Sequence, residues 1–335
     1  MVNEIKNNDM KICDFVKKQN AMKNIFTPGP ASLLAENLSG LRPCFGRGDK
    51  DYEWVENKVL GYLKTMSGHE FVVPLQGSAS LALEIMIRNF LKGKVLIVSS
   101  GYYSDRLELI LEMFNVDSNY IDSIEHVDWS GLEELEGKYD WVLSCSTETS
   151  IGLRLPISWL STQAKRLHAK LMLDATASIG LESNHDLADV IAYSSCKGLF
   201  GLTGAGFVAF NELPDNKVNS FYLDLHSHLG KRMTGPYHAI ASLLDVLPVH
   251  SEFREAVVIN KNLFCTKMKD YLVYDKTHQP LLCTFITQKL MPTNDKVILY
   301  QSRANTEGQV VAHLGEVCLG SNAKGEILNN LMQKK

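Results

Sequence analysis

The feature that most constrains this chain is a lysine set between two apolar segments and followed by glycines. Residues 189–210 read DVIAYSSCKGLFGLTGAGFVAF, so an apolar, β-prone segment leads to Lys197 and another apolar segment follows at 207–210. Four glycines fall between positions 198 and 206. Small residues are needed where a backbone turns tightly or approaches a ligand closely. This spacing therefore favours a lysine held in a site over a lysine that is simply solvated.

A carboxylate occupies a similar place further upstream. The segment KLMLDATASIG places Asp174 at the end of an expected strand. A neutral, desolvated lysine forms a Schiff base with an aldehyde, and a carboxylate keeps a pyridine nitrogen protonated. The pair indicates a site for pyridoxal 5'-phosphate (PLP). Each residue alone also has an ordinary interpretation, Lys197 as a loop lysine and Asp174 as an N-cap before residues 175–178.

Composition and charge exclude several classes of function. The 335 residues are 45% hydrophobic and 21% charged with a net charge of −4, so we expect a globular protein without a nucleic-acid partner. No apolar stretch has membrane-spanning length, and the polar N-terminus does not resemble a signal peptide. The seven cysteines form no CxxC pair, which favours reduced thiols in the cytoplasm and no metal site.

Strands and helices alternate between residues 70 and 200, which predicts an α/β fold with a mostly parallel sheet flanked by helices. We expect a lead-in helix at 1–24, a large domain at 25–255 and a small α+β C-terminal domain at 256–335. The other expected helices are 51–67, 81–91, 107–114, 159–169, 237–247, 251–271 and 322–332, and the expected strands end near 76, 100, 146, 174, 193, 210, 287 and 300.

Further candidates follow expected strands of this sheet, where ligands gather in parallel α/β folds. The turn Gly77-Ser78-Ala79-Ser80 opens a helix, so its N–H groups and hydroxyls are suited to a phosphate; simple N-capping is the alternative. Tyr103 follows the next strand, either stacking on a cofactor ring or packing on its own helix. A polar loop with Thr149 follows a third strand.

Seven segments in this order resemble the class V aminotransferases of PLP fold type I. The similarity is greatest to the 2-aminoethylphosphonate–pyruvate transaminases, followed by the alanine–glyoxylate transaminases. It spans about residues 25–245 and rests on FTPGPA (26–31), QGSASLALE (76–84), GYYSDR (101–106), ETSIG (148–152), LDATASIG (173–180), SSCKGLFGLTGAGFV (194–208) and TGPYHA (234–239).

The resemblance implies a role for each candidate residue. Lys197 would be the Schiff-base lysine and the general acid/base, and Asp174 would pair with the pyridine nitrogen. Thr234 would reach the phosphate of a second subunit, so that the active site is complete only in a homodimer. The remaining cofactor contacts would come from Tyr103 on the ring, Ser78, Ala79 and Ser80 on the phosphate, and Thr149 near the ring hydroxyl.

The sequence departs from the family at the residue that binds the substrate carboxylate. The family has an arginine in a segment like Phe-Arg-Ile-Gly, whereas residues 312–315 here read AHLG and place His313 there. An imidazole cannot form the two-pronged bond of a guanidinium. Either Arg303 or another arginine takes the place of the family's arginine, or residues 312–315 do not correspond to this family segment, or the substrate is not an ordinary pair of an α-amino acid and an α-keto acid. Arg42 and Arg47 are further candidates for binding an anionic substrate, with surface-loop positions as their ordinary interpretation.

We therefore expect a PLP-dependent aminotransferase that moves an amino group from a small amine, 2-aminoethylphosphonate being preferred, to a keto acid such as pyruvate. Another class V PLP enzyme, either an alanine–glyoxylate-type transaminase or a lyase, is one alternative. A non-catalytic protein with the PLP fold is the other.

Overall fold

The computed structural model describes residues 2–42, 48–117, 119–230, 233–292, 294–304, 307–315 and 317, with the backbone alone at 2–10 and 117. The expected helix at 322–332 and Arg47 lie outside these residues. None of the helices in the described part of the chain combines the length and the apolar character needed to cross a bilayer.

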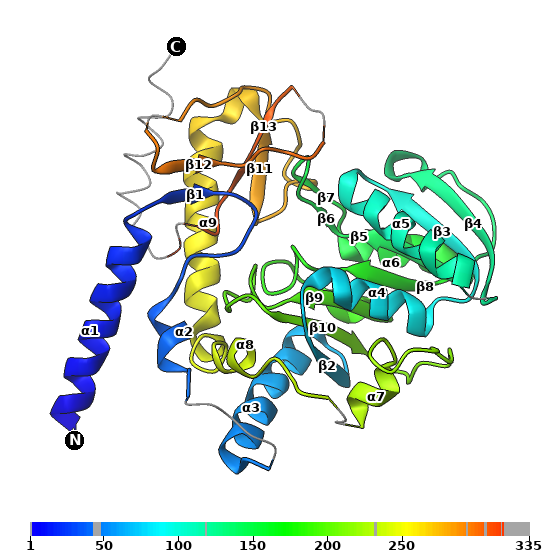
Figure 1. Ribbon diagram of the computed structural model, residues 1–335. Helices are drawn as coiled ribbons and strands as arrows, with labels where there is room; N and C mark the ends of the chain where they lie inside the picture. The colour runs from blue at the N-terminus through cyan, green and yellow to red at the C-terminus, as the bar shows by residue number, and fades with distance from the viewer. Residues whose placement is uncertain are drawn as a thin grey trace.

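A seven-stranded sheet forms the centre of the molecule (Figure 1). β10 runs antiparallel to both of its neighbours, β2 and β9, and the other neighbouring pairs are parallel, as the alternation of strands and helices predicted. The strands in spatial order are β2 (Phe71–Gln76), β10 (Ala205–Phe210), β9 (Val190–Ser194), β8 (Lys170–Asp174), β5 (Trp141–Cys145), β3 (Gly93–Ser99) and β4 (Ile121–Asp128).

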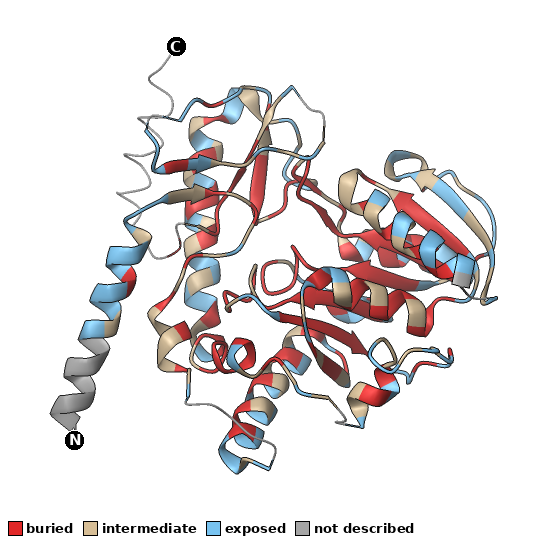
Figure 2. Ribbon diagram, viewed as in Figure 1, coloured by how far each residue is buried: buried red, intermediate tan, exposed pale blue. Residues whose placement is uncertain are grey.

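Helices cover both faces of this sheet, and for this reason its inner strands are largely apolar. On one face, α3 (Lys50–Ser67) and α6 (Ile157–Arg166) pack on side chains such as Leu171 and Leu173. On the other face, α4 (Ala79–Phe90) and α5 (Tyr102–Asp117) pack on Leu143 and Met172. All residues of β5 and β9 are buried, as Figure 2 shows for the centre of the sheet.

Beside this sheet lies a smaller layer, which consists of residues 24–26 and the described part of residues 272–315 and contains two two-stranded sheets. α1 (Val2–Asn20) projects from the body, and α9 (His250–Lys267) runs into the small layer (Figure 1). The short elements are β1 (Asn24–Phe26), α2 (Ala35–Ser39), β6 (Thr147–Glu148), β7 (Leu153–Arg154), α7 (Leu225–Leu229), α8 (Tyr237–Ala241), β11 (Cys283–Ile286), β12 (Val297–Leu299) and β13 (Gln309–Ala312).

Some elements differ from the sequence prediction. β1 pairs with β12, so residues 24–26 join a sheet of the small layer, whereas we placed residues from 25 onward in the large domain. The remaining domain boundaries stay predictions. α4 and α5 begin at Ala79 and Tyr102, earlier than expected, and α8 ends at Ala241. β1 and β13 were not anticipated because each is only three or four residues long and is stabilised by a distant strand.

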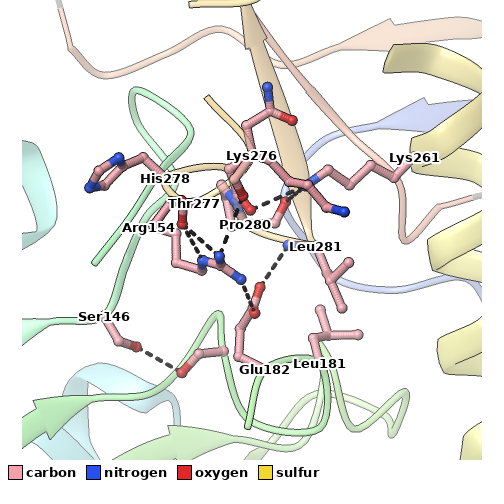
Figure 3. Close-up of polar contacts among 12 residues, drawn as sticks. Ser146, Arg154, Leu181, Glu182, Lys261, Lys276, Thr277, His278, Pro280 and Leu281 are labelled. Atoms are coloured by element: carbon pink, nitrogen blue, oxygen red, sulfur yellow. Dashed lines mark hydrogen bonds and ion pairs between the residues drawn. The ribbon is translucent and has the colours of Figure 1, made fainter. Parts of the chain in front are cut away.

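One segment of the small layer is bound tightly to the large one (Figure 3). Arg154 donates to the carbonyl oxygens of Lys276 and Thr277 and pairs with Glu182 at 2.9 Å. The other oxygen of Glu182 accepts from the N–H of Leu281 at 2.7 Å. These contacts fix residues 276–281 to β7 and to the loop that follows β8.

Candidate active site

A cavity of about 580 Å³ lies at the carboxyl ends of the central strands. On the side of the central sheet, the first turns of α4 and α5, the ends of β5, β8 and β9, and the loop before β10 reach this cavity. From the small layer, Arg303 reaches it. The structure brings together most of the predicted site residues there, namely Ser78, Ala79, Ser80, Tyr103, Thr149, Asp174, Lys197 and Arg303.

Lys197 is placed by very close backbone approaches. A Cβ added to Gly198 would lie 2.2 Å from the carbonyl oxygen of Ile179, so only glycine fits after the lysine. Gly29, in the Pro-Gly-Pro turn, packs directly on the lysine side chain: a Cβ there would lie 3.0 Å from Cγ of Lys197. The N–H of Ala31 donates to the carbonyl of Cys196 at 2.8 Å. The turn at 26–31 therefore forms one wall around the lysine, a contact that the sequence did not reveal.

Asp174 is buried at the end of β8, with 3% of its surface exposed. Its Oδ1 accepts from the N–H of Thr176 at 2.9 Å, within a turn and not at the start of a helix, and its Oδ2 pairs with Nη2 of Arg106 at 2.9 Å. A buried carboxylate requires such partners because desolvation disfavours its charge. Asp174 thus presents a compensated negative charge to the cavity.

Arg106 is a site residue that our sequence reasoning did not single out. Its guanidinium carbon lies 4.8 Å from the ring centroid of Tyr103, and Nη1 lies 3.4 Å from Oγ of Ser80. The signal was present, since Arg106 follows Tyr103 by three positions in the GYYSDR segment and therefore shares its helix face. Nζ of Lys197 lies 5.7 Å from the same ring. The Tyr103 ring thus lies close to both the lysine and the arginine.

The start of α4 offers unpaired donors to the cavity. Ser78 occupies the N-cap position, but its hydroxyl makes no capping bond to the helix, so the simple capping alternative is wrong. The N–H groups of Leu81 and Ala82 donate to the carbonyl of Ser78, whereas those of Ala79 and Ser80 have no backbone partner among the described residues. The helix dipole adds a partial positive charge. Ser78, Ala79 and Ser80 therefore form a cradle suited to an anion such as a phosphate.

Other polar atoms facing the cavity also lack partners. The hydroxyls of Thr149 and Thr176 are buried without a hydrogen-bond partner among the described residues, and both residues line the cavity. Buried hydroxyls are normally paired, so these atoms fit a polar ligand between them. Burial raises the pKa of the nearby Cys145 thiol well above its usual value, and the charge of Asp174 adds to this. Cys145 is therefore a neutral wall residue.

Three predicted residues lie elsewhere. His313 is completely buried in the small layer, with Nε2 2.9 Å from Oγ1 of Thr284, so our expectation that it binds substrate is not supported by its position. Arg42 is exposed and donates to the carbonyl oxygens of Ser39 and Leu41. Thr234 lines a second cavity, of about 380 Å³, with residues of α3 and β2.

Comparisons with known proteins agree with this geometry. No family model matches the chain. The 2-aminoethylphosphonate–pyruvate transaminase of Pseudomonas aeruginosa is 28% identical over 252 residues, covering 68% of each chain. The ureidoglycine–glyoxylate aminotransferase structure from Bacillus subtilis superposes with a TM-score of 0.77 at 16% identity, covering 92% of both chains. An alanine–glyoxylate aminotransferase structure from Nostoc sp. gives 0.75 at 17% identity, covering 92% of this chain and 93% of that one.

These findings confirm the expected resemblance to class V aminotransferases and the PLP fold type I. They also confirm the expectations of an aminotransferase and of PLP as its cofactor. The identity of the amino donor and the roles of individual residues go beyond them.

Proposed function

We propose that this protein transfers the amino group of 2-aminoethylphosphonate to pyruvate, with Lys197 as the amine that holds PLP. One observation carries the proposal: Lys197, Asp174 and the unpaired donors at the start of α4 all face a single cavity. Sequence similarity to 2-aminoethylphosphonate–pyruvate transaminases supports the choice of donor.

The residues that line the cavity would each bind a different part of the cofactor. Ser78, Ala79 and Ser80 would hold the cofactor phosphate, Tyr103 would stack on the ring, and Thr149 would bond near the ring hydroxyl. Asp174 would accept from the protonated ring nitrogen, its charge being already oriented by Arg106. The bound cofactor supplies an electron-accepting ring that stabilises negative charge at the amine-bearing carbon. Nζ of Lys197 would move the proton from this carbon to C4′ of the cofactor, and it would move a proton in the opposite direction when the keto acceptor takes up the amino group.

The anionic group of the donor would bind at the mouth of the cavity. Arg303 lines this mouth and is exposed, with Nη1 donating to the hydroxyl of Tyr102 at 3.1 Å. Its remaining guanidinium donors suit a phosphonate or a carboxylate. In this proposal Arg303 replaces the arginine that the family carries where His313 stands.

We further propose that the enzyme acts as a homodimer. Thr234 does not line the cofactor cavity of its own chain, which fits a residue supplied to a second subunit. Trp54 on α3 and Phe221 before α7 expose 58% and 62% of their surfaces, as residues at an interface between subunits often do in the free chain. The described cysteines are free thiols, which supports a location in the cytoplasm.

A half-reaction tests the function. Protein loaded with PLP should lose its visible absorption band on addition of 2-aminoethylphosphonate without a keto acid, and pyruvate should restore the band. L-alanine bleaching the band while 2-aminoethylphosphonate leaves it intact would instead favour an alanine–glyoxylate-type enzyme. A band unchanged by every amine would contradict the proposal. Size-exclusion chromatography with light scattering tests the dimer.

A further inference from the structure

A buried carboxylate outside the cavity holds two of its walls. Glu148, in β6, is completely buried and does not line the cavity. Its Oε2 accepts from the backbone N–H of Tyr103 at 2.8 Å and of Ser104 at 3.3 Å, at the start of α5. A negative charge there also interacts favourably with the dipole of α5. Glu148 therefore fixes the backbone that carries the Tyr103 ring.

The other oxygen of the same carboxylate reaches the substrate side. Oε1 accepts from the N–H of Ser150 at 3.1 Å and from its hydroxyl. The carbonyl of Ser150 in turn accepts from the hydroxyl of Ser302, and this hydroxyl accepts from the N–H of Ala304 at 3.0 Å. Arg303 lies between these last two residues. One carboxylate is thus joined by hydrogen bonds to the segment that carries the arginine at the cavity mouth.

The two branches meet again at Tyr102. Arg303 donates to the Tyr102 hydroxyl, and Tyr102 precedes Tyr103 at the start of α5. The contacts form a closed ring that runs from Glu148 through α5 to Arg303 and back through Ser302 and Ser150. Burial raises the pKa of the Glu148 carboxyl, while its hydrogen bonds from Ser150, Tyr103 and Ser104 oppose that shift.

We propose that Glu148 is a positioning residue that sets both the cofactor-stacking ring of Tyr103 and the anion-binding side chain of Arg303. The inference rests on the proposed function, because it assigns PLP to one branch and the anionic donor to the other. Loss of the α5 branch, the hydrogen bonds from Tyr103 and Ser104 to Oε2, weakens PLP binding. Loss of the Ser150 branch, the hydrogen bonds from Ser150 to Oε1, weakens donor binding and leaves PLP in place.

Substitution by glutamine separates the branches. The amide has one accepting oxygen, so one set of N–H donors must face its NH₂ group. Two backbone N–H groups of α5 face one side, whereas the other side has a single N–H group, that of Ser150, and the Ser150 hydroxyl, which can turn to accept. In Glu148→Gln, we therefore expect the amide oxygen to keep accepting from the N–H groups of α5. The PLP dissociation constant of this variant should stay within about threefold of wild type. Its KM for 2-aminoethylphosphonate should rise about tenfold, as for a lost bond to a charged group.

Two further variants and a control complete the test. Ser302→Ala should raise KM to a similar extent with PLP affinity unchanged, and Glu148→Ala should raise both constants about tenfold. Asp128→Asn is the matched control. Asp128 accepts from the N–H and the hydroxyl of Ser130, two positions on, as Glu148 does from Ser150, but it lies away from the cavity. It should change neither constant.

The outcomes are separable. Unchanged KM in folded Glu148→Gln and Ser302→Ala proteins, or unchanged PLP affinity in Glu148→Ala, overturns the role of Glu148. A wild-type protein that binds PLP but accepts no amino group from 2-aminoethylphosphonate overturns the proposed function alone. In that case, the PLP affinities of the three Glu148 and Ser302 variants, measured by absorbance titration, still decide the inference.

Discussion

Replacing Gly29 by alanine perturbs Lys197 without touching the lysine itself. Gly29 has a φ of +148°, which L-residues rarely adopt, and its added Cβ would lie 3.0 Å from Cγ and 3.3 Å from Cε of Lys197. The backbone strain costs about 1–3 kcal/mol. Unfolding 335 residues releases about 0.7 kcal/mol per kelvin of entropy, so 2 kcal/mol lowers the melting temperature by about 3 °C.

The lysine chain must also move by a few tenths of an ångström to relieve the contact. Reactive groups have to be held within about 0.5 Å of their working positions, so we expect PLP to bind about tenfold more weakly. Absorbance titration with PLP measures this effect, and scanning calorimetry measures the loss of stability. Gly48→Ala is the control, since Gly48 has a φ of +80° and no atom of the described residues lies within 4 Å of the added Cβ. The reasoning is refuted if Gly29→Ala binds PLP as tightly as Gly48→Ala does.

Three further predictions concern Arg303 at the cavity mouth, the buried His185, and the ion pair of Arg154 that holds the small layer. Arg303→Gln should raise KM for 2-aminoethylphosphonate at least tenfold with PLP affinity unchanged, and an unchanged KM would exclude the arginine from donor binding. Burial lowers the pKa of His185 to about 4 from 6.5. The unfolded chain therefore binds the proton first as pH falls, and stability is lost between about pH 6.5 and 4, by about 2 kcal/mol at pH 5. Urea titrations at pH 7.5 and 5 should show a smaller loss in His185→Gln, and an equal loss would refute this assignment. Arg154→Met leaves Glu182 without its cation and should cost about 2 kcal/mol, with residues 276–281 cut faster in limited proteolysis; an unchanged cleavage rate would contradict the role of the pair.

Strong local patterns made the central sheet predictable. The apolar segments that end at Asp174 and Ser194 are buried on both faces, and continuous burial of this kind is what a parallel sheet between two helix layers requires. Lys197 and Asp174 could be placed in one site because neighbouring parallel strands end at the same edge. The order of the strands in space does not follow from any local pattern.

The parts that sequence reasoning missed depend on distant partners. β1 exists because β12 pairs with it, some 270 positions away. Pairing between His313 and Thr284 is equally non-local. For this reason the comparison of residues 312–315 with the family segment placed in the substrate site a histidine that belongs to the core. Arg106 could have been found by its spacing from Tyr103, but its pairing with Asp174 could not, since 68 positions separate the two.

Chemical trapping at the lysine tests the central claim most directly. Protein loaded with PLP is reduced with borohydride, digested and analysed by mass spectrometry. The account predicts that the phosphopyridoxyl group is found on Lys197 and that Lys197→Ala takes up no label, although its cavity still binds PLP reversibly. Label on a different lysine, or equal labelling of Lys197→Ala, would contradict it.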